Sequence, residues 1–432
     1  MARRLATTEV PEYYPFVRWE PLATPGRGRK GVTEVTAALD GLRILDMTQY
    51  EAGTSCTQML AWLGADVVKV ESPHGDPGRL AFGKGDVDSQ YFLNYNSNKR
   101  SIVLDLKQPA GRDLLLALVP KFDVFVENFG PGVMEALGLG YDVLRARNAA
   151  IIYARIKGYG LTGPHAHWKC FDPLAQAAAG AFSVTGDPDG PPVKPGPTMA
   201  DSGTGMQAAL AITAAWAHKL RTGEGQSIEV SMQEVMTMFM RTTGVLQWAT
   251  EPVARHGHRG GAPTGMYPCA PGDSNDYVYM LISNTRMWDQ LCVAIGRDDL
   301  LTDPRFESAR LRSQHGDVLD AEISAWTKQH TKFEAMQILC DHGVAASAVF
   351  DTMDVFNDPH LRARNFIQQV SHPAAGAVTL MGSPIRMSAS TVPLRAAPLL
   401  GADTEAVIET ELGLDRQEIE ALKASGAIGV RM

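Results

Sequence analysis

Asp201 is the residue of this 432-residue chain whose type and setting could do the most chemistry. It precedes the segment Ser202–Gly205, which reads SGTG, and an alanine-rich run follows from Met206 to Leu220. That run contains neither proline nor glycine and predicts a buried helix. Asp201 is therefore expected on a glycine-loosened turn at or just before a helix N-terminus, where backbone N–H groups and the helix dipole favour a negative charge. Such a carboxylate can act as a nucleophile or simply cap the helix, and these residues alone favour the cap.

The elements that would position Asp201 begin near residue 42. The sequence predicts a strand from Leu42 to Met47, a helix from Ser55 to Leu63, and a second strand from Val67 to Glu71. Strand, helix and strand within about 30 residues form a βαβ unit, which implies a parallel sheet. An acidic residue ends the second strand, as in dinucleotide-binding folds, but the first loop holds only Gly53 and lacks their glycine fingerprint. A nicotinamide or flavin site is not expected.

The alternation of strands and helices continues along the chain. We predict strands at Ser101–Leu106, Asp123–Glu127 and Ile151–Ile156, separated by helices. This pattern is typical of an α/β fold with a doubly wound, Rossmann-like parallel sheet. Ligands of such sheets lie beyond the carboxyl ends of the strands. Four loops should therefore surround one crevice, and they are Gln49–Gly53, Ser72–Arg79, Asn128–Gly132 and Lys157–Gly160.

The character of the sequence changes at both ends of this region. Residues 1–38, rich in proline, glycine and charge, are interpreted as an extended N-terminal arm, with disorder as the alternative. We assign residues 39–245 and 357–432 to a large domain. Residues 246–356, with a glycine-rich basic opening, one clear strand and several amphipathic helices, are assigned to a smaller α+β domain.

Composition excludes several classes of function. A net charge of −8 without a basic block argues against nucleic-acid and membrane-surface binding, and no apolar run reaches the roughly 20 residues that span a bilayer. Five scattered cysteines contain no C-x-x-C pair, so no disulfide framework or zinc site is indicated. The H-x-H pairs His165/His167 and His256/His258 lack a third ligand at a telling distance, so metal binding is not favoured. The N-terminus lacks the apolar core of a signal peptide, and a cytoplasmic location is expected.

Basic residues near the predicted crevice could hold the phosphates of a nucleotide-like ligand, with Asn128 in a Gly/Pro turn beside them. Ordinary solvated surface is the alternative for each of these residues, which are Arg79, Lys99, Arg100, Lys157 and Lys169.

Several stretches resemble the class III CoA-transferases, the CaiB/BaiF family that includes formyl-CoA transferases. They occur in the family's order from about Leu39 to the C-terminus: LDGLRILDMTQYEAGTSCTQMLAWLGADVVKVESPHGDPGR, NYNSNKRSIVLDLK, DVFVENFGPGVMEALGLGYDVL, IIYARIKGYG, ADSGTGMQAALAI, GEGQSIEVSMQEV and DPHLRARNFIQQVSHP. The resemblance implies the doubly wound fold in an interlocked homodimer.

The resemblance also implies roles for individual residues. Asp201 matches the catalytic aspartate, and the positions that contact CoA in the family match Lys169, Asn128 and Leu104. Glu51 falls where formyl-CoA transferases carry a glutamine facing the acyl group. Positions close to the acyl site correspond to Asp172, Gly260 and Gly261, of which the glycines resemble a shortened glycine loop. Ser72 and Ala136 replace CoA-binding arginines, which puts the pair formyl-CoA and oxalate in doubt.

The implied reaction moves CoA from an acyl-CoA donor to a free carboxylic acid without a tightly bound cofactor or metal. Asp201 would form a mixed anhydride with the acyl group and then an aspartyl-CoA thioester. An α-methylacyl-CoA racemase is the alternative enzyme. It is disfavoured because the racemases carry a histidine where this chain has Phe171, which cannot move a proton. A non-catalytic acyl-CoA-binding protein is the third possibility.

Overall fold

The computed structural model describes residues 37–83, 88–244, 250–258 and 260–429. The chain divides into two compact units, Met1–Val35 and Thr36–Met432, and every described residue belongs to the second. The predicted N-terminal arm therefore lies almost entirely outside the described residues.

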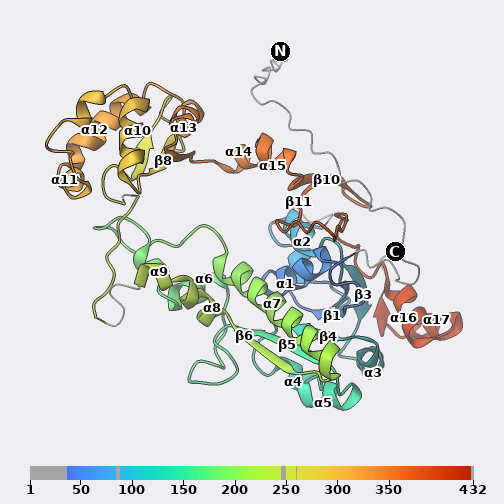
Figure 1. Cartoon of the computed structure of the whole chain (residues 1–432). Helices are drawn as coiled ribbons and strands as arrows, with labels where there is room; N and C mark the ends of the chain where they lie inside the picture. The colour runs from blue at the N-terminus through green and yellow to red at the C-terminus, as the bar shows by residue number, and fades with distance from the viewer. Residues whose placement is uncertain (1–36, 84–87, 245–249, 259, 430–432) are drawn as a thin grey trace. The chain divides into compact units, whose positions relative to one another are not determined.

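A seven-stranded sheet organises this second unit, in the order β12-β3-β2-β1-β4-β5-β6 (Figure 1). Strands β1 to β6 pair in parallel, and β12 joins the edge antiparallel to β3. Without β12 the order is 3-2-1-4-5-6, that of a doubly wound dinucleotide-binding fold, so the predicted α/β sheet is confirmed. The strands are β1 (Arg43–Met47), β2 (Asp66–Glu71), β3 (Arg100–Leu104), β4 (Val124–Glu127), β5 (Ile152–Lys157), β6 (Ser227–Ser231) and β12 (Ile428–Gly429).

Helices cover both faces of the sheet. One face packs in an apolar cluster with α1 (Ala52–Trp62), α6 (Asp172–Ala178), α7 (Met199–Thr222) and α8 (Met232–Phe239). The other face packs with α3 (Pro109–Leu118), α5 (Tyr141–Arg147), α16 (Thr404–Leu412) and α17 (Arg416–Ala424). Short helices α2 (Gln90–Asn96), α4 (Val133–Ala136) and α9 (Arg241–Gly244) complete this part.

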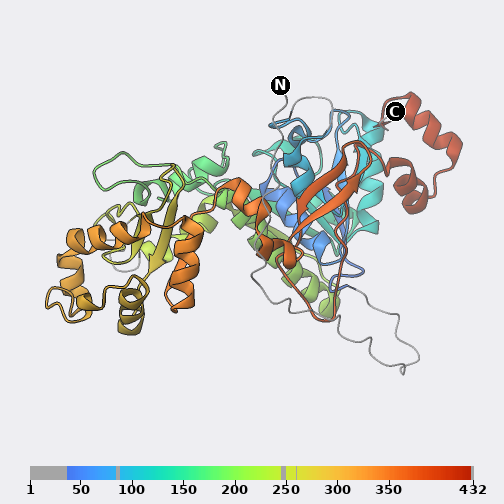
Figure 2. The same ribbon diagram turned by 90° about the horizontal axis from the view of Figure 1, so that it is seen from above.

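Two antiparallel sheets lie in the second half of the chain (Figure 2). The first comprises β7 (Gly265–Pro268), β8 (Tyr277–Leu281) and β9 (Ala345–Ala348), and its apolar core is separate from those of the large sheet. The helices of this part are α10 (Thr285–Ala294), α11 (Ala309–Gln314), α12 (Gly316–Thr327) and α13 (Lys332–Asp341). Helices α14 (Thr352–Asn357) and α15 (Pro359–Ala363) lead to the two-stranded sheet of β10 (Ile367–His372) and β11 (Gly376–Met381).

No helix within the described ranges is both long and apolar enough to cross a bilayer.

Candidate active site

Asp201 lies inside helix α7 rather than on a turn before it. The helix begins at Met199, seven residues earlier than the sequence predicts, so Asp201 occupies the first helical turn. The segment Ser202–Gly205 is helical. Neither Ser202 nor Thr204 caps the helix, because the Thr204 hydroxyl donates to the carbonyl of Ala200 within it. The prediction of a glycine-loosened turn is therefore wrong.

The two glycines of this segment serve close packing. A Cβ on Gly205 would lie 2.0 Å from Ser55 Oγ and 2.9 Å from the carbonyl oxygen of Ala52, both in α1. A Cβ on Gly203 would lie 2.5 Å from the ring of Phe239 in α8. These separations are shorter than van der Waals contact, so only glycine lets α7 approach the two helices this closely.

The cap of α7 comes from Asp172, the first residue of α6. Its Oδ1 accepts hydrogen bonds from the backbone N–H groups of Ala200 at 2.9 Å and Asp201 at 3.1 Å. Its Oδ2 accepts from Gln176 Nε2, which also donates to the carbonyl of Pro197. Asp172 is 4% exposed. This carboxylate thus fixes the turn that carries Asp201, using N–H groups that a helix start leaves unsatisfied.

Burial of Asp201, together with the nearby carboxylates Glu51 and Asp172, raises the pKa of Asp201 to about 8. The helix dipole was expected to keep this side chain ionised. Desolvation and two like charges outweigh that effect here, since both disfavour the charged form. The group therefore ionises only as pH approaches 8, and in its ionised state it is a poorly solvated carboxylate.

Glu51 lies beside Asp201, buried at the start of α1. Its Oε1 accepts hydrogen bonds from Thr198 Oγ1 and, at 2.8 Å, from Ser202 Oγ. Tyr95 of α2 also hydrogen-bonds to Glu51, and burial beside it raises the pKa of that phenol. Sequence analysis missed these three hydroxyl groups. The adjacency of Ser202 to Asp201 was a usable signal, whereas α2 was not predicted at all.

The loop that presents Glu51 is held from two sides. Asn128, after β4, accepts from the N–H of Gln49 and donates to its carbonyl, each at 2.8 Å. Asp76 accepts from the N–H of Tyr50 at 3.2 Å and pairs with the fully buried Lys69 at 2.8 Å. The Asn128 amide, predicted to contact CoA, is thus engaged with the backbone of this loop.

Four of the five basic residues singled out in the sequence form ion pairs with carboxylates of the chain, and three of the four are buried. Arg79 is 4% exposed and pairs with Glu71 at 2.6 Å and Asp88 at 2.8 Å. Lys157 pairs with Glu127 at 2.7 Å. Lys99 and Arg100 pair with Asp46 and Asp66. Lys169 is exposed three residues before Asp172, which opens α6, and no described acidic side chain pairs with it. These ion pairs indicate a structural role for Arg79 and Lys157.

A pocket of about 330 Å³ lies at the carboxyl edge of β1, β2 and β3. The predicted crevice loops contribute Gln49 and Ser72–Asp76, and the turn after β3 contributes Leu104–Lys107. Leu104 lies in the wall of this pocket, and its contact with CoA stays a prediction. Lys107, which sequence analysis did not single out, is an exposed cation in this wall.

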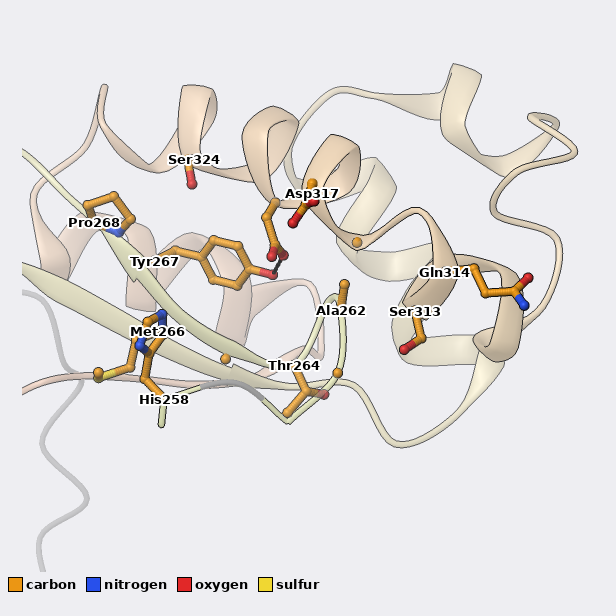
Figure 3. A pocket seen from close by; sticks show the side chains of 14 residues that line it. His258, Ala262, Thr264, Met266, Tyr267, Pro268, Ser313, Gln314, Asp317 and Ser324 are labelled. Carbon is orange, nitrogen blue, oxygen red and sulfur yellow. Dashed lines mark hydrogen bonds between the residues drawn. The ribbon is translucent and has the colours of Figure 1, made fainter. Parts of the chain in front are cut away.

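The predicted glycine loop lies in another part of the fold. Gly260 and Gly261 form a turn closed by two backbone hydrogen bonds with Thr264. Gly261 has a φ of +88° and lines a pocket of about 350 Å³ beside β7, α11 and α12. Figure 3 shows this pocket, in which the Tyr267 hydroxyl donates to Asp320 at 2.7 Å. None of its lining residues comes from the seven-stranded sheet or from α7.

The H-x-H pairs show no metal-ligand arrangement. His165 stacks on Trp168 with ring centroids 3.9 Å apart. Across the described residues, no group of three or more histidine, cysteine, aspartate or glutamate side chains is placed to hold a metal ion.

Comparison with known proteins identifies the family. Residues 39–404 match CoA-transferase family III. The chain is 38% identical to a formyl-CoA:oxalate CoA-transferase of Streptomyces coelicolor, over 90% of this chain and 99% of that protein. It is 36% identical to a protein of the same name from Rhodopseudomonas palustris, over 91% of this chain and 98% of that one.

Solved structures agree. A CaiB/BaiF family protein from Brucella suis is similar with a TM-score of 0.79 and 31% identity, covering 87% of this chain and 100% of that one. A protein from Mycobacterium tuberculosis is similar with a TM-score of 0.74 and 30% identity, over 85% and 98% of the two chains. The chain belongs to CoA-transferase family III and is an enzyme of the CoA-transferase type, a family whose substrates are CoA thioesters.

Proposed function

We propose that this enzyme transfers CoA from an acyl-CoA donor to a free carboxylic acid with Asp201 as the nucleophile. The Asp201 carboxylate attacks the thioester carbonyl, the C–S bond breaks, and CoA leaves as a thiolate from a mixed anhydride. The thiolate then attacks the aspartyl carbonyl and releases the donor acid. The resulting aspartyl-CoA thioester passes CoA to the second acid through a second anhydride, which regenerates Asp201.

The observation that carries the proposal is the setting of Asp201. Its turn is fixed by the Asp172 carboxylate, and its side chain is partly buried beside Glu51, a combination that raises its pKa to about 8. Asp201 is not needed as the cap of α7, because the backbone N–H groups at the start of this helix already donate to Asp172. A perturbed pKa in a buried site is typical of catalytic groups.

For CoA, we propose the pocket at the carboxyl edge of β1 to β3. Its wall combines the partly exposed apolar side chains of Leu106 and Phe129 with an exposed cation at Lys107. Lys169, exposed three residues before the start of α6, would supply a second cation. Charged groups of this kind suit phosphates. Arg79 and Lys157 are not part of this assignment, because their side chains are paired within the protein.

The glycine pair is proposed to reach the acyl site across an interlocked homodimer, with Gly260 and Gly261 closing over a carboxylate of the other chain. Formyl-CoA and oxalate, the substrates named for the relatives, form the first pair to assay.

Asp201→Asn tests the mechanism. Asparagine keeps the shape of the side chain and removes the attacking charge, so transfer should fall by at least about three orders of magnitude while the fold persists. Hydroxylamine added with acyl-CoA donor should convert Asp201 to a hydroxamate, detected by mass mapping of its peptide only when donor is present. Labelling at Asp172 or Glu51 would move the nucleophile to that residue. Asp201-dependent deuterium incorporation into a 2-methylacyl-CoA would favour the racemase instead.

A further inference from the structure

Two aromatic rings stand half-exposed at the edge of the Asp201 site. Tyr50 is 42% and Phe171 is 59% exposed. Their centroids are 6.4 Å apart with the ring planes at 86°, an edge-to-face pair. The rings come from loops after two different strands, β1 and β5, so the tertiary fold brings them together.

Each ring is anchored next to a carboxylate of the site. Tyr50 immediately precedes Glu51, whose Oε1 accepts from Thr198 and Ser202 at the start of α7. Phe171 immediately precedes Asp172, whose Oδ1 accepts from the N–H of Asp201. The ring pair therefore spans the two loops that position the nucleophile.

The backbone at Tyr50 is strained. Its φ is +58°, in the left-handed region that bulky residues rarely adopt. The conformation is held by Asp76 Oδ1, which accepts from the N–H of Tyr50, and by the Thr54 hydroxyl, which donates to its carbonyl. Strain held by surrounding hydrogen bonds is typical of functional sites, and here it keeps a large ring out of the core and against Phe171.

The carboxylate of Glu51, close to Asp201, restricts which acids could bind against these rings. Glu51 is 2% exposed and accepts from neutral hydroxyl groups, and no described cation forms an ion pair with it. In the aspartyl-CoA thioester, Asp201 is neutral, so an incoming acid meets the charge of Glu51. A second carboxylate close to the reacting one would be repelled, whereas an apolar group would find the ring pair.

We propose that Tyr50 and Phe171 bind the acyl group of the transferred acid, and that the preferred acids are monocarboxylic acids with an apolar, ring-sized acyl group such as phenyl. This inference rests on the proposed function, because it assigns a substrate class to the same site. Edge-to-face contacts favour a third planar ring, which would add to the aromatic pair.

Isotope exchange tests the substrate class without knowledge of the natural donor and acceptor. An enzyme with a covalent intermediate incorporates a labelled free acid into its own acyl-CoA, so each pair needs one acid. The pairs are acetate with acetyl-CoA, succinate with succinyl-CoA, and phenylacetate with phenylacetyl-CoA. We expect kcat/KM for the phenylacetyl pair to exceed the other two by at least about tenfold, a factor that one well-buried ring can supply.

Variants of the full-length chain test the residues. Tyr50→Ala and Phe171→Ala should each lower the phenylacetyl-to-acetyl ratio of exchange rates by about three- to tenfold, with the KM for acetyl-CoA unchanged. The ratio is measured within one preparation, so a reduced folded fraction cancels. Phe333→Ala is the matched control, because Phe333 on α13 is 43% exposed and pairs edge-to-face with Phe350 at 5.6 Å, outside the elements that carry Asp201, Glu51 and Asp172. It should leave the ratio unchanged.

Other results would overturn the proposal in distinguishable ways. Equal or faster exchange of the acetyl or succinyl pair in the unmodified enzyme would refute the substrate class and leave CoA transfer intact. A uniform slowing of all pairs with a raised KM for every acyl-CoA would assign the rings to the pantetheine arm. If exchange of all pairs slows equally and light scattering shows a changed mass, the two rings belong to a contact between subunits. Absence of exchange for every acid tested, formate and oxalate included, would contradict the proposed function itself.

Discussion

Three carboxylates within one small site have three different environments. Asp172 accepts hydrogen bonds from two backbone N–H groups and a glutamine amide, and Glu51 accepts hydrogen bonds from hydroxyl groups. Burial and the two neighbouring carboxylates raise the pKa of Asp201, the one group of the three to which no described side chain donates a hydrogen bond. This division separates positioning from reaction.

The raised pKa of Asp201 predicts how activity depends on pH. Because attack requires the carboxylate, kcat/KM for the acyl-CoA donor should rise about tenfold per pH unit below 8 and level off above it. Glu51→Gln removes one of the two like charges that raise this pKa, so the rising limb should move to lower pH. A profile that is flat from pH 6 to pH 9 in both proteins would contradict the assignment.

The same shift predicts a stability effect in the opposite direction. Between about pH 4 and 8, Asp201 is ionised in the unfolded chain and protonated in the fold, so folding stability falls as pH rises through this window. Asparagine does not titrate. The Asp201→Asn variant should therefore gain stability relative to the parent from pH 4 to pH 8, measured by denaturant unfolding, with no further gain above pH 8.

Glu51 should shape the choice of acceptor. Glutamine keeps the size and the hydrogen-bond acceptor of this side chain while removing its charge. Glu51→Gln should therefore raise kcat/KM for small dicarboxylates such as oxalate by about tenfold relative to monocarboxylates, as expected when like-charge repulsion of about 1.4 kcal/mol is removed. Competition between oxalate and acetate for one acyl-CoA donor measures the ratio. An unchanged ranking would show that Glu51 does not face the acceptor.

At the scale of elements, the site depends on how closely α7 lies against α1. Gly205→Ala would improve helix propensity by about 1 kcal/mol, but its Cβ would fall 2.9 Å from a backbone oxygen of α1. The steric overlap should outweigh the gain in helix propensity, with a net loss of about 2 kcal/mol or more in unfolding free energy and reduced transfer activity. Gly130→Ala is the control, since Gly130 is exposed with open space around its Cα, and its stability should change by less than about 0.5 kcal/mol. Equal effects for both variants would remove the packing argument.

At the scale of the whole molecule, the candidate residues belong to two cores. Asp201, Glu51 and Asp172 lie with the seven-stranded sheet, whereas Gly260 and Gly261 precede the sheet of β7–β9. The exposed face of α7 carries large apolar side chains, Met206 at 49% and Leu210 at 64% exposure, spaced one helical turn apart. A second copy of the chain would cover such a face.

We therefore predict a homodimer in dilute solution. Light scattering should give twice the chain mass of 46.7 kDa at concentrations where the enzyme is active. Mixing Asp201→Asn with a variant of the glycine pair, such as Gly261→Val, should restore some activity if chains exchange, because one of the two mixed sites would then be intact. A fully active monomer would refute the dimer.

The order and type of the main elements could be read from the sequence, because they depend on local patterns. Alternating apolar runs predicted the strands of a doubly wound sheet. Asp201, Glu51 and Asp172 could be named because the motifs that carry them resemble a family. The domain boundaries of residues 246–356 remain a prediction.

What each residue does was decided by contacts between distant segments, which no local pattern encodes. Asp172 caps a helix that begins 27 residues later, and the SGTG segment is helical because its glycines let α7 meet α1 and α8. Arg79 was assigned to a phosphate, yet two buried carboxylates hold it. The sequence by itself determined the fold and the family, since periodicity and motif order are local properties. Only the tertiary structure decided which charged side chains are paired and which distant residues contact each other, because burial and pairing exist only once the chain has folded.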